Sequence, residues 1–304
     1  MTGALRRLLG TVRRTQPGAL DLYFGSLRDG HASIEREFFL SLRLSNGTAK
    51  TSADHRLDDL NAVVAPLLAI GRPLAIMDAA AGSGISSLEW VDQLRASGRD
   101  VQLTAGDLSP WCWVTSWGTR CAIVSLDDGR APSVELYGRR FSLDSERWIV
   151  RRVRTALAAG LAAAVATIGA RVTSPPFEPP RAGRMVHRRV ALVSPRVVAR
   201  KEIEVIPDDL MEGGRFQACF DAVRATNVLN RAYFPEPILT LMITTLAERV
   251  RDGGLLIIGR TEEETGNHAT VFRRSGTAMS VQARLGRGSE VEALVLSAQP
   301  SARS

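Results

Sequence analysis

Apolar positions along this 304-residue chain repeat with two spacings, one typical of strands and one typical of helices. Short continuous apolar runs, the pattern of strands buried on both faces, lie at 74–79, 101–105, 203–206, 222–226 and 255–259. Apolar residues recur every three or four positions at 86–97 and at 237–252, which predicts amphipathic helices. Apolar strands that alternate with helices predict an α/β fold whose parallel sheet is covered on both faces.

The pattern changes after the fifth strand. The stretches "HATVFRR" at 268–274 and "VEALVLS" at 291–297 have no long helix between them. We expect these two stretches to form an antiparallel pair at the sheet edge. The predicted fold is therefore a Rossmann-like, seven-stranded, mostly parallel sheet with an antiparallel edge pair.

The spacing of these elements predicts three regions. Helical patterns in "SIEREFFLSLRLS" and "DDLNAVVAPLLAIG" predict an N-terminal helical cap over residues 1–71. The sheet and its helices form a core made of residues 72–107 and 201–304. Residues 108–200 separate the second and third strands by far more than one helical crossover needs, so we interpret them as an insertion. Its pattern predicts a β-hairpin around Asp128-Gly129, then a helix at 148–172 that ends before a proline-rich stretch.

The positive charge of the chain is concentrated in that insertion. Residues 147–201 hold twelve Arg and Lys residues and one acid, Glu178, for a local charge of +11; the total is +7, so the remainder is −4. Within the helix 148–172, sixteen residues from 155 to 170 are uncharged, short of the roughly 20 that span a bilayer. Two interpretations stay open: the helix lies in a membrane interface, or it packs on the domain or in a homodimer. The apolar middle of this segment, without interleaved aromatics, argues against nucleic acid.

The sequence "MDAAAGSGISSLEW" at 77–90 joins the first predicted strand to a helix through small residues. A phosphate-binding P-loop would need a lysine after Gly84, and a dinucleotide fingerprint would need a glycine at Ser87. The remaining alternative is a loop that holds S-adenosylmethionine, in which an acid, Asp78, precedes Gly82 and Gly84. The glycines let the backbone approach a ligand closely, and the acid can pair with the ammonium of its methionine part.

Acidic and amide side chains follow the later strands. Asp107 ends the second strand, where a carboxylate can accept from both ribose hydroxyls. Asp208 and Asp209 follow the third strand, within reach of an adenine amino group, although a capping or turn role is the alternative for each acid. Asn227 follows the fourth strand. The tryptophans that follow Asp107, at 111, 113 and 117, have two interpretations: stacking on adenine, or packing of the insertion.

Taken in order, these stretches resemble the class I S-adenosylmethionine-dependent methyltransferases. The resemblance covers residues 72–107 and 201–297, and "RATNVLNRAYF" is similar to a stretch of the glutamate methyltransferases that modify chemotaxis receptors. One departure is Ala80, which stands where the family has its first glycine, and which a negative φ would accommodate. The resemblance implies cofactor contacts from Asp78, Ala80, Gly82, Ser83, Gly84, Asp107, Leu108, Asp209, Leu210, Asn227 and Val228.

Methyl transfer to a small molecule, or to a lipid or glycan intermediate near a membrane, is the function that this resemblance implies. The alternatives are a protein carboxyl or side-chain methyltransferase, and a non-catalytic protein that keeps the fold for binding. No metal is expected, because the donor is already activated and the protein mainly aligns a nucleophile. The candidate catalytic residues are His31, Tyr233 and Arg260. Three cysteines without metal spacing, and no secretory signal, predict a bacterial cytoplasmic protein, with membrane association as the alternative.

Overall fold

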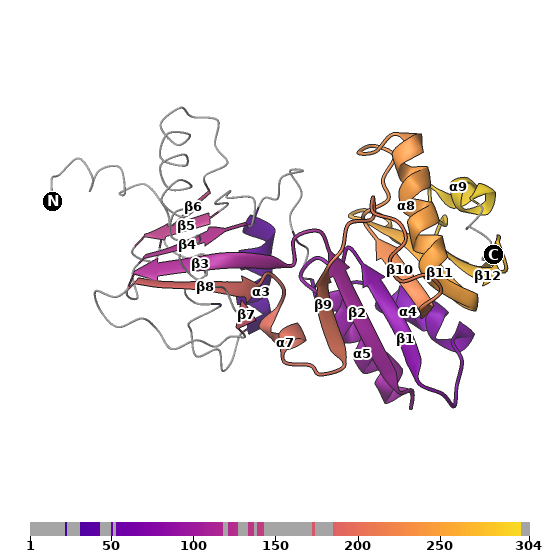
Figure 1. Ribbon diagram of the computed structural model, residues 1–304, viewed down its shortest axis with the longest axis horizontal. Coiled ribbons are helices and arrows are strands. Elements are labelled where there is room, and N and C mark those ends of the chain that lie inside the picture. The colour runs from indigo at the N-terminus through magenta and orange to yellow at the C-terminus, as the bar shows by residue number, and fades with distance from the viewer. Residues whose placement is uncertain are drawn as a thin grey trace, which may run out of the picture. The chain divides into compact units, whose positions relative to one another are not determined.

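The computed structural model describes residues 22, 31–42, 50, 53–117, 121–126, 133–136, 139–142, 172–173 and 185–298. Contacts divide the chain into two compact units, each with its own sheet (Figure 1). The core unit comprises Ala53–Pro110 and Arg196–Ser304. The β unit comprises Met1–Ser52 and Trp111–Pro195.

The core unit contains a seven-stranded sheet in the order β13-β12-β11-β10-β1-β2-β9. Its strands are β1 (Leu74–Ala79), β2 (Val101–Asp107), β9 (Ile203–Pro207), β10 (Phe220–Thr226), β11 (Val250–Glu262), β12 (Gly266–Ser275) and β13 (Ala278–Leu285). The first five pair in parallel, and β12 is antiparallel to both β11 and β13. The predicted fold class is therefore confirmed, and all five predicted parallel strands are present.

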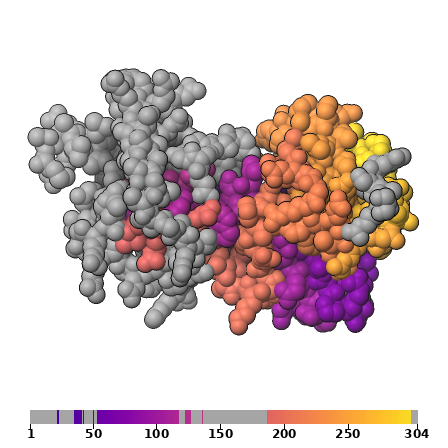
Figure 2. Space-filling view, in the orientation of Figure 1, coloured from indigo at the N-terminus to yellow at the C-terminus, as the bar shows by residue number. Residues whose placement is uncertain are grey.

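Helices cover both faces of this sheet. They are α4 (Asp58–Val64), the short 3-10 helix η1 (Ala65–Leu67), α5 (Ile85–Ala96), α7 (Pro195–Val198), α8 (Glu236–Arg249) and α9 (Glu292–Ser297). One face packs Met77, Val223 and Leu256 against α8 and α9. In Figure 2 the yellow C-terminal segment lies against the orange α8 on this face. The opposite face carries α4 and α5.

The composition of the edge pair differs from the prediction. "VEALVLS" was expected to be a strand but forms α9, and the strand that pairs with β12 is "AMSVQARL", β13. Val291, Leu294 and Val295 follow helical spacing, and Val291 and Val295 are fully buried against the core. Seven residues are too few to separate the two periodicities, whereas the alternation in "AMSVQARL" is the strand signal that the sequence interpretation missed.

The β unit is built on a six-stranded sheet in the order β6-β5-β4-β3-β8-β7. Its elements are α3 (His31–Ser41), β3 (Trp111–Trp117), β4 (Cys121–Ser125), β5 (Ser133–Leu136), β6 (Arg139–Ser142), β7 (Val172–Thr173) and β8 (Met185–Ala191). Cys112, Val114 and Val190 on one face form a core with Phe38 and Phe39 of α3. The expected hairpin tip at Asp128-Gly129 lies outside the described residues. So does the expected helix 148–172, apart from Val172, which begins β7.

The other face of β3 accounts for two of the tryptophans. Trp113 stacks on His187 of β8, with ring centroids 4.5 Å apart and planes 6° from parallel. Arg189 lies over Trp111, 5.9 Å from its ring centroid. Burial lowers the pKa of His187, so its ring is biased toward the neutral form that stacks here. These contacts favour the packing interpretation for both tryptophans.

Asp221, at the amino end of β10, yields a prediction about acid stability. Its carboxylate is 5% exposed and accepts hydrogen bonds from Arg72 Nη2 (2.6 Å) and the Ala75 backbone (2.8 Å), beside Arg251 (3.1 Å). Burial by itself would raise the pKa of Asp221, but these hydrogen bonds and positive charges lower it below 3.8. The charged Asp221 carboxylate and its partners therefore stabilise the folded state above pH 3.8. This contribution is lost as the pH falls through the lower pKa that Asp221 has in the folded protein.

We expect Asp221→Asn to unfold at lower urea concentration than the wild type at pH 7. The difference between the two proteins should narrow below about pH 4, as the wild-type carboxylate becomes protonated. Urea denaturation at a series of pH values measures this difference. A gap that stays constant from pH 7 to pH 3 would contradict the role assigned to the Asp221 charge.

Candidate functional site

The candidate site lies at the carboxyl ends of the parallel strands. The strand order reverses direction between β1 and β10, and in open α/β sheets ligands bind outside the carboxyl ends at such a switch point. Hydrogen bonds hold the connecting loops together there. Ala81 N donates to Gly106 O (2.9 Å), Asp208 N to Asp107 O (3.0 Å), and Asn227 N to Gly259 O (2.9 Å). The fold thus gathers the predicted residues after β1, β2, β9 and β10 along one edge.

The loop from β1 to α5 turns through three left-handed residues. Ala80, Gly82 and Gly84 have φ values of +56°, +65° and +79°. The expectation of a negative φ at Ala80 is therefore wrong. The chain must leave a strand and enter a helix within five residues, and this sharp turn forces Ala80 into a backbone conformation that L-residues other than glycine avoid. Space is also tight at Gly84, where an added Cβ would lie 3.0 Å from a methyl group of Val197.

Ala80→Gly is expected to raise the free energy of unfolding by about 1 kcal/mol, because glycine removes the steric cost of the left-handed conformation. Ala81→Gly is the matched control. Its φ is not positive, so glycine there should lower the free energy of unfolding by about 0.5–1 kcal/mol. Chemical denaturation of the two variants measures both values, and equal destabilisation by both would show that Ala80 is unstrained.

Asp107 connects the end of β2 to this loop. Its side chain is 8% exposed, and its two oxygens accept hydrogen bonds from the backbone of Gly82 and of Ser109, each at 2.9 Å. A carboxylate oxygen accepts more than one hydrogen bond, so these contacts orient the group without excluding a ligand hydroxyl. The next residue, Leu108, is 66% exposed and presents an apolar side chain beside it.

Asp78 has a different environment from the one predicted. It is 3% exposed and forms a two-pronged ion pair with the fully buried Arg224: Nε to Oδ1 at 3.0 Å and Nη2 to Oδ2 at 2.6 Å. Ser87 Oγ also donates to its Oδ2 (2.6 Å). The negative charge expected to meet a ligand ammonium is thus already balanced by an arginine of the neighbouring strand.

Arg224 joins four elements through its guanidinium. Besides Asp78, it donates to Asn61 Oδ1 of α4 (2.8 Å) and to the Ser86 carbonyl of α5 (2.8 Å), and it lies 4.4 Å from the centroid of the Trp90 ring. Asp78 and Arg224 are direct partners in the β1–β10 register. Arg224 interrupts an apolar run in the sequence, but its partner Asp78 lies 146 residues away and is not identifiable from the sequence.

Arg224→Ala is expected to lower the free energy of unfolding by about 3–5 kcal/mol, because it leaves Asp78 charged and buried without its partner. Arg284→Ala provides the comparison. Arg284 pairs with Glu292 at 2.7 Å but its side chain is 53% exposed, so its loss should cost less than about 1 kcal/mol. Urea denaturation at pH 7 measures both, and similar losses would contradict the central role of Arg224.

The two acids that follow β9, Asp208 and Asp209, differ in how deeply they are buried. Asp208 is 7% exposed and pairs with the fully buried Arg249 through contacts of 2.7 and 2.9 Å. Asp209 is half-buried, and its Oδ1 accepts from Met211 N (2.8 Å) in a local turn. Leu210, also predicted to contact the cofactor, is 6% exposed and belongs to the hydrophobic core. Asp209 is therefore the acid of this pair that remains near the surface.

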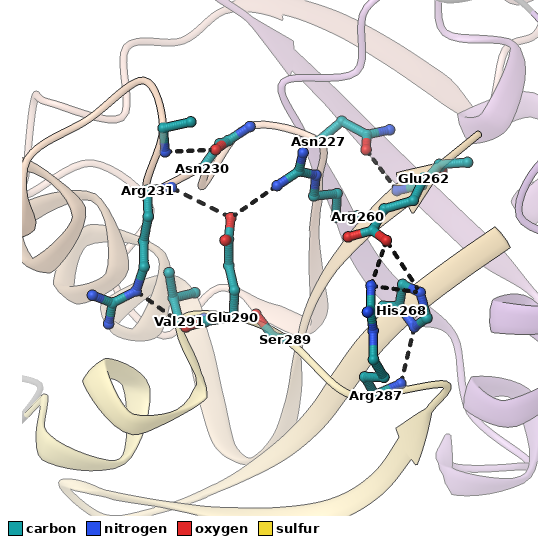
Figure 3. A network of polar contacts seen from close by, with 12 residues as sticks. Asn227, Asn230, Arg231, Arg260, Glu262, His268, Arg287, Ser289, Glu290 and Val291 are labelled. Atoms are coloured by element: carbon teal, nitrogen blue, oxygen red, sulfur yellow. Dashed lines mark hydrogen bonds and ion pairs between the residues drawn. The ribbon is translucent and has the colours of Figure 1, made fainter. Parts of the chain in front are cut away.

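Asn227 closes the end of β10 and is linked to β11. Its φ is +60°, a conformation that asparagine tolerates better than most residues, and its Oδ1 accepts from Thr261 N (2.8 Å). Val228 packs on the core, and Asn230 Oδ1 accepts from Ala232 N (2.8 Å). These bonds hold the loop after β10 against the end of β11 (Figure 3).

The polar network in Figure 3 surrounds this loop. Glu290 accepts from Arg231 N (3.3 Å) and pairs with Arg260 at 3.5 Å. Glu262 pairs with Arg287 and accepts from Thr265 Oγ1 (2.7 Å). The hydrogen bond from Thr265 is the main cause that lowers the pKa of Glu262; desolvation opposes it and the Arg287 charge supports it.

Of the three candidate catalytic residues, Tyr233 and Arg260 belong to the core unit and His31 to the β unit. Arg260 is paired with Glu290, and the Tyr233 side chain is 66% exposed. His31 begins α3 in the β unit, and its side chain lies outside the described residues. A further histidine, His268, accepts from Arg287 N at Nδ1 (2.9 Å), which places its proton on Nε2, 2.8 Å from Thr265 Oγ1.

Two residues that the sequence interpretation missed lie beside the loop. Arg56 donates to Thr261 Oγ1 near the end of β11 (3.1 Å) and to Ser86 Oγ in the first turn of α5 (3.3 Å). Glu89, on the next turn of α5, accepts from His55 N (2.5 Å). Arg56 Nε and Glu89 Oε2 are buried and have no hydrogen-bond partner. Arg56 lies in the turn before α4 and Glu89 on α5, and a charged residue at either place carries no sequence signal for such a role.

Neither a metal site nor a membrane span is found in the part of the chain that the structure describes. No group of three or more His, Cys, Asp or Glu side chains there could hold a metal ion. No helix there is both long and apolar enough to cross a bilayer.

No protein-family model and no curated protein matches the chain. Solved structures do match it, many of them S-adenosylmethionine-dependent methyltransferases. The 1,6-didemethyltoxoflavin N1-methyltransferase of Burkholderia thailandensis, solved with 1,6-didemethyltoxoflavin and S-adenosylhomocysteine, is 13% identical; the match covers 81% of this chain and 67% of that one, with a TM-score of 0.35.

Two further neighbours are more partial. A protein assigned as a methyltransferase of an antibiotic biosynthesis pathway in Anabaena variabilis is 9% identical, with 69% of this chain and 49% of that one covered and a TM-score of 0.32. The [4+2]-cyclase SpnF is 15% identical, with coverages of 68% and 46% and a TM-score of 0.31. The chain spans about half the length of these two structures. At such identities the similarity concerns the fold, and function depends on the site.

Proposed function

We propose that this chain is an S-adenosylmethionine-dependent methyltransferase acting on a small-molecule acceptor. The observation that carries the proposal is the loop at 80–84, with three left-handed residues at the switch point of the sheet, held by the Asp107 carboxylate. Such a loop lets backbone atoms approach a ligand that side chains would keep away. An acid at the end of the next strand supplies acceptors for ribose hydroxyls.

The residues around the loop fit most of this cofactor. Asp107 would accept from the ribose hydroxyls, the exposed Leu108 would cover the adenine face, and Asp209 would accept from the adenine amino group. Asn227 would border the site through the backbone that it orders. Asp78 does not fit its expected role, because its residue is only 3% exposed and its charge is balanced by the fully buried Arg224.

The cofactor supplies a methyl group already activated by the sulfonium charge. The protein's contribution is to align the acceptor and exclude water, which requires no metal and no dedicated base. In line with a site that needs no dedicated base, Arg260 pairs with Glu290, and His268 accepts a hydrogen bond from Arg287 N. A lipid or glycan acceptor at a membrane depends on the predicted helix 148–172, which lies outside the described residues apart from Val172. A protein acceptor is the remaining enzymatic alternative.

The ion pair at Asp78 favours a second candidate, a binding protein that keeps the fold without methyl transfer. A loop acid neutralised by a resident arginine has lost the charge that attracts the ligand ammonium. Calorimetry separates the two candidates. A methyltransferase binds S-adenosylmethionine and S-adenosylhomocysteine, and the purified second candidate would release no heat with either.

Asp107→Ala and Asp107→Asn are expected to weaken S-adenosylhomocysteine binding about 10-fold or more, because each removes charge-assisted hydrogen bonds to the ribose. Asp252→Ala serves as control, since that carboxylate accepts from Gly276 N (2.7 Å) in a turn away from the loop. Isothermal titration calorimetry measures the affinities, and thermal unfolding confirms that each variant is folded. Unchanged affinity in folded Asp107 variants would overturn the cofactor assignment.

A further inference from the structure

The ion pair between Asp78 and Arg224 leaves open which groups would meet the charged end of an amino-acid ligand. Arg224 is fully buried, and Asp78 is 3% exposed. Freeing Asp78 would leave the buried Arg224 without its charged partner, which is strongly unfavourable. The recognition of a ligand ammonium and carboxylate therefore falls to other charged residues near the loop.

Arg56 and Glu89 are those residues. Arg56 is bonded to Ser86 Oγ, and Ser86 and Glu89 are three positions apart on α5 and so lie on the same side of the helix. The backbone of His55, the residue before Arg56, donates to Glu89 Oε1 at 2.5 Å. One cation and one anion thus stand side by side where the loop enters α5.

Each of the two side chains is incompletely satisfied. Arg56 Nε and Glu89 Oε2 are buried without hydrogen-bond partners, and leaving a buried polar atom unpaired is unfavourable. Burial raises the pKa of Glu89 and, helped by the Arg224 charge, lowers that of Arg56, as expected for charges that lack sufficient partners. The other charged groups around them are His55, Asp54, Asp58 and Asp78.

We infer that Arg56 and Glu89 bind the zwitterionic amino-acid end of the ligand, with Arg56 on the carboxylate and Glu89 on the ammonium. The inference rests on the proposed function, since the ligand it describes is an S-adenosyl amino acid. An α-amino acid carries its two charges on one carbon, so it can satisfy a neighbouring cation and anion together. Because Arg224 neutralises Asp78 at the end of β1, the ammonium is bound instead by Glu89 on α5.

The test uses the wild-type chain and three ligands. S-adenosylhomocysteine carries both charges, its decarboxylated analogue lacks the carboxylate, and its deaminated analogue lacks the ammonium. Each truncated ligand should bind the wild type about 10- to 100-fold more weakly than S-adenosylhomocysteine, by loss of one charge-assisted contact. Equal affinity for all three ligands would overturn the inference while leaving the proposed cofactor in place.

Two variants assign each contact to its residue. Arg56→Gln should lower the affinity for S-adenosylhomocysteine about 10-fold or more but leave the affinity for the decarboxylated analogue unchanged. Glu89→Gln should likewise lower the affinity for S-adenosylhomocysteine but leave the affinity for the deaminated analogue unchanged. A uniform loss for all three ligands would indicate a merely structural role and overturn the assignment. A wild type that binds none of the ligands would overturn the proposed function itself.

Arg99→Gln and Glu204→Gln are the matched controls. Arg99, like Arg56, has a buried Nε without a partner, but it lies beyond the carboxyl end of α5 and bonds to Ala65 O. Glu204 is an exposed acid on β9. Neither control should change the ranking of the three ligands, and a change equal to that of Arg56→Gln would show that the effect is not local.

Discussion

The buried ion pair between Arg224 and Asp78 constrains the core unit more than any other described contact. Removing two charges from water costs several kcal/mol per ion, and only close geometry and additional hydrogen bonds compensate for it. Here the compensation comes from Asn61, the Ser86 carbonyl, Ser87 and the face of Trp90. Because these groups belong to α4, α5, β1 and β10, the pair fixes how both helices lie on the sheet. A second buried pair, Arg249 with Asp208, joins α8 to the end of β9.

The chemistry of the site follows from that constraint. Once Asp78 is balanced internally, the loop after β1 presents backbone and small side chains, and its charge comes from Asp107 on one side and from Arg56 and Glu89 on the other. Ala80 has a strained, left-handed backbone at the position where the ligand is proposed to approach. Such strain often occurs at functional sites, where the surrounding structure holds the backbone in place. The buried carboxylates Asp78 and Asp208 and the left-handed residues Ala80 and Asn227 thus lie at the carboxyl ends of the parallel strands.

The long segment between β2 and β9 does not disturb their pairing. β2 and β9 are direct neighbours, with Asp107 opposite Pro207, although the β unit's strands stand between them in sequence. Each unit has its own hydrophobic core, so the chain can leave after β2 and return before β9 without breaking the pairing. The entropic cost of closing a loop grows only slowly with loop length, so a long segment between two paired strands destabilises the fold little.

The apolar periodicity by itself determined the parallel strands, the helices between them and the order of the ligand loops, because burial on both faces of a sheet leaves a continuous apolar run in each strand. It failed at "VEALVLS", where seven residues fit both periodicities and packing on α8 selected a helix. The acids at 78, 107, 208 and 209 were visible in the sequence, but their partners were not. Arg224 and Arg249 lie 146 and 41 residues from the carboxylates that they neutralise, and Arg56 reaches Thr261 across 205 residues. Which carboxylates are buried in ion pairs and which groups remain for a ligand was decided only by tertiary structure, because charge pairing depends on distance in space and on burial.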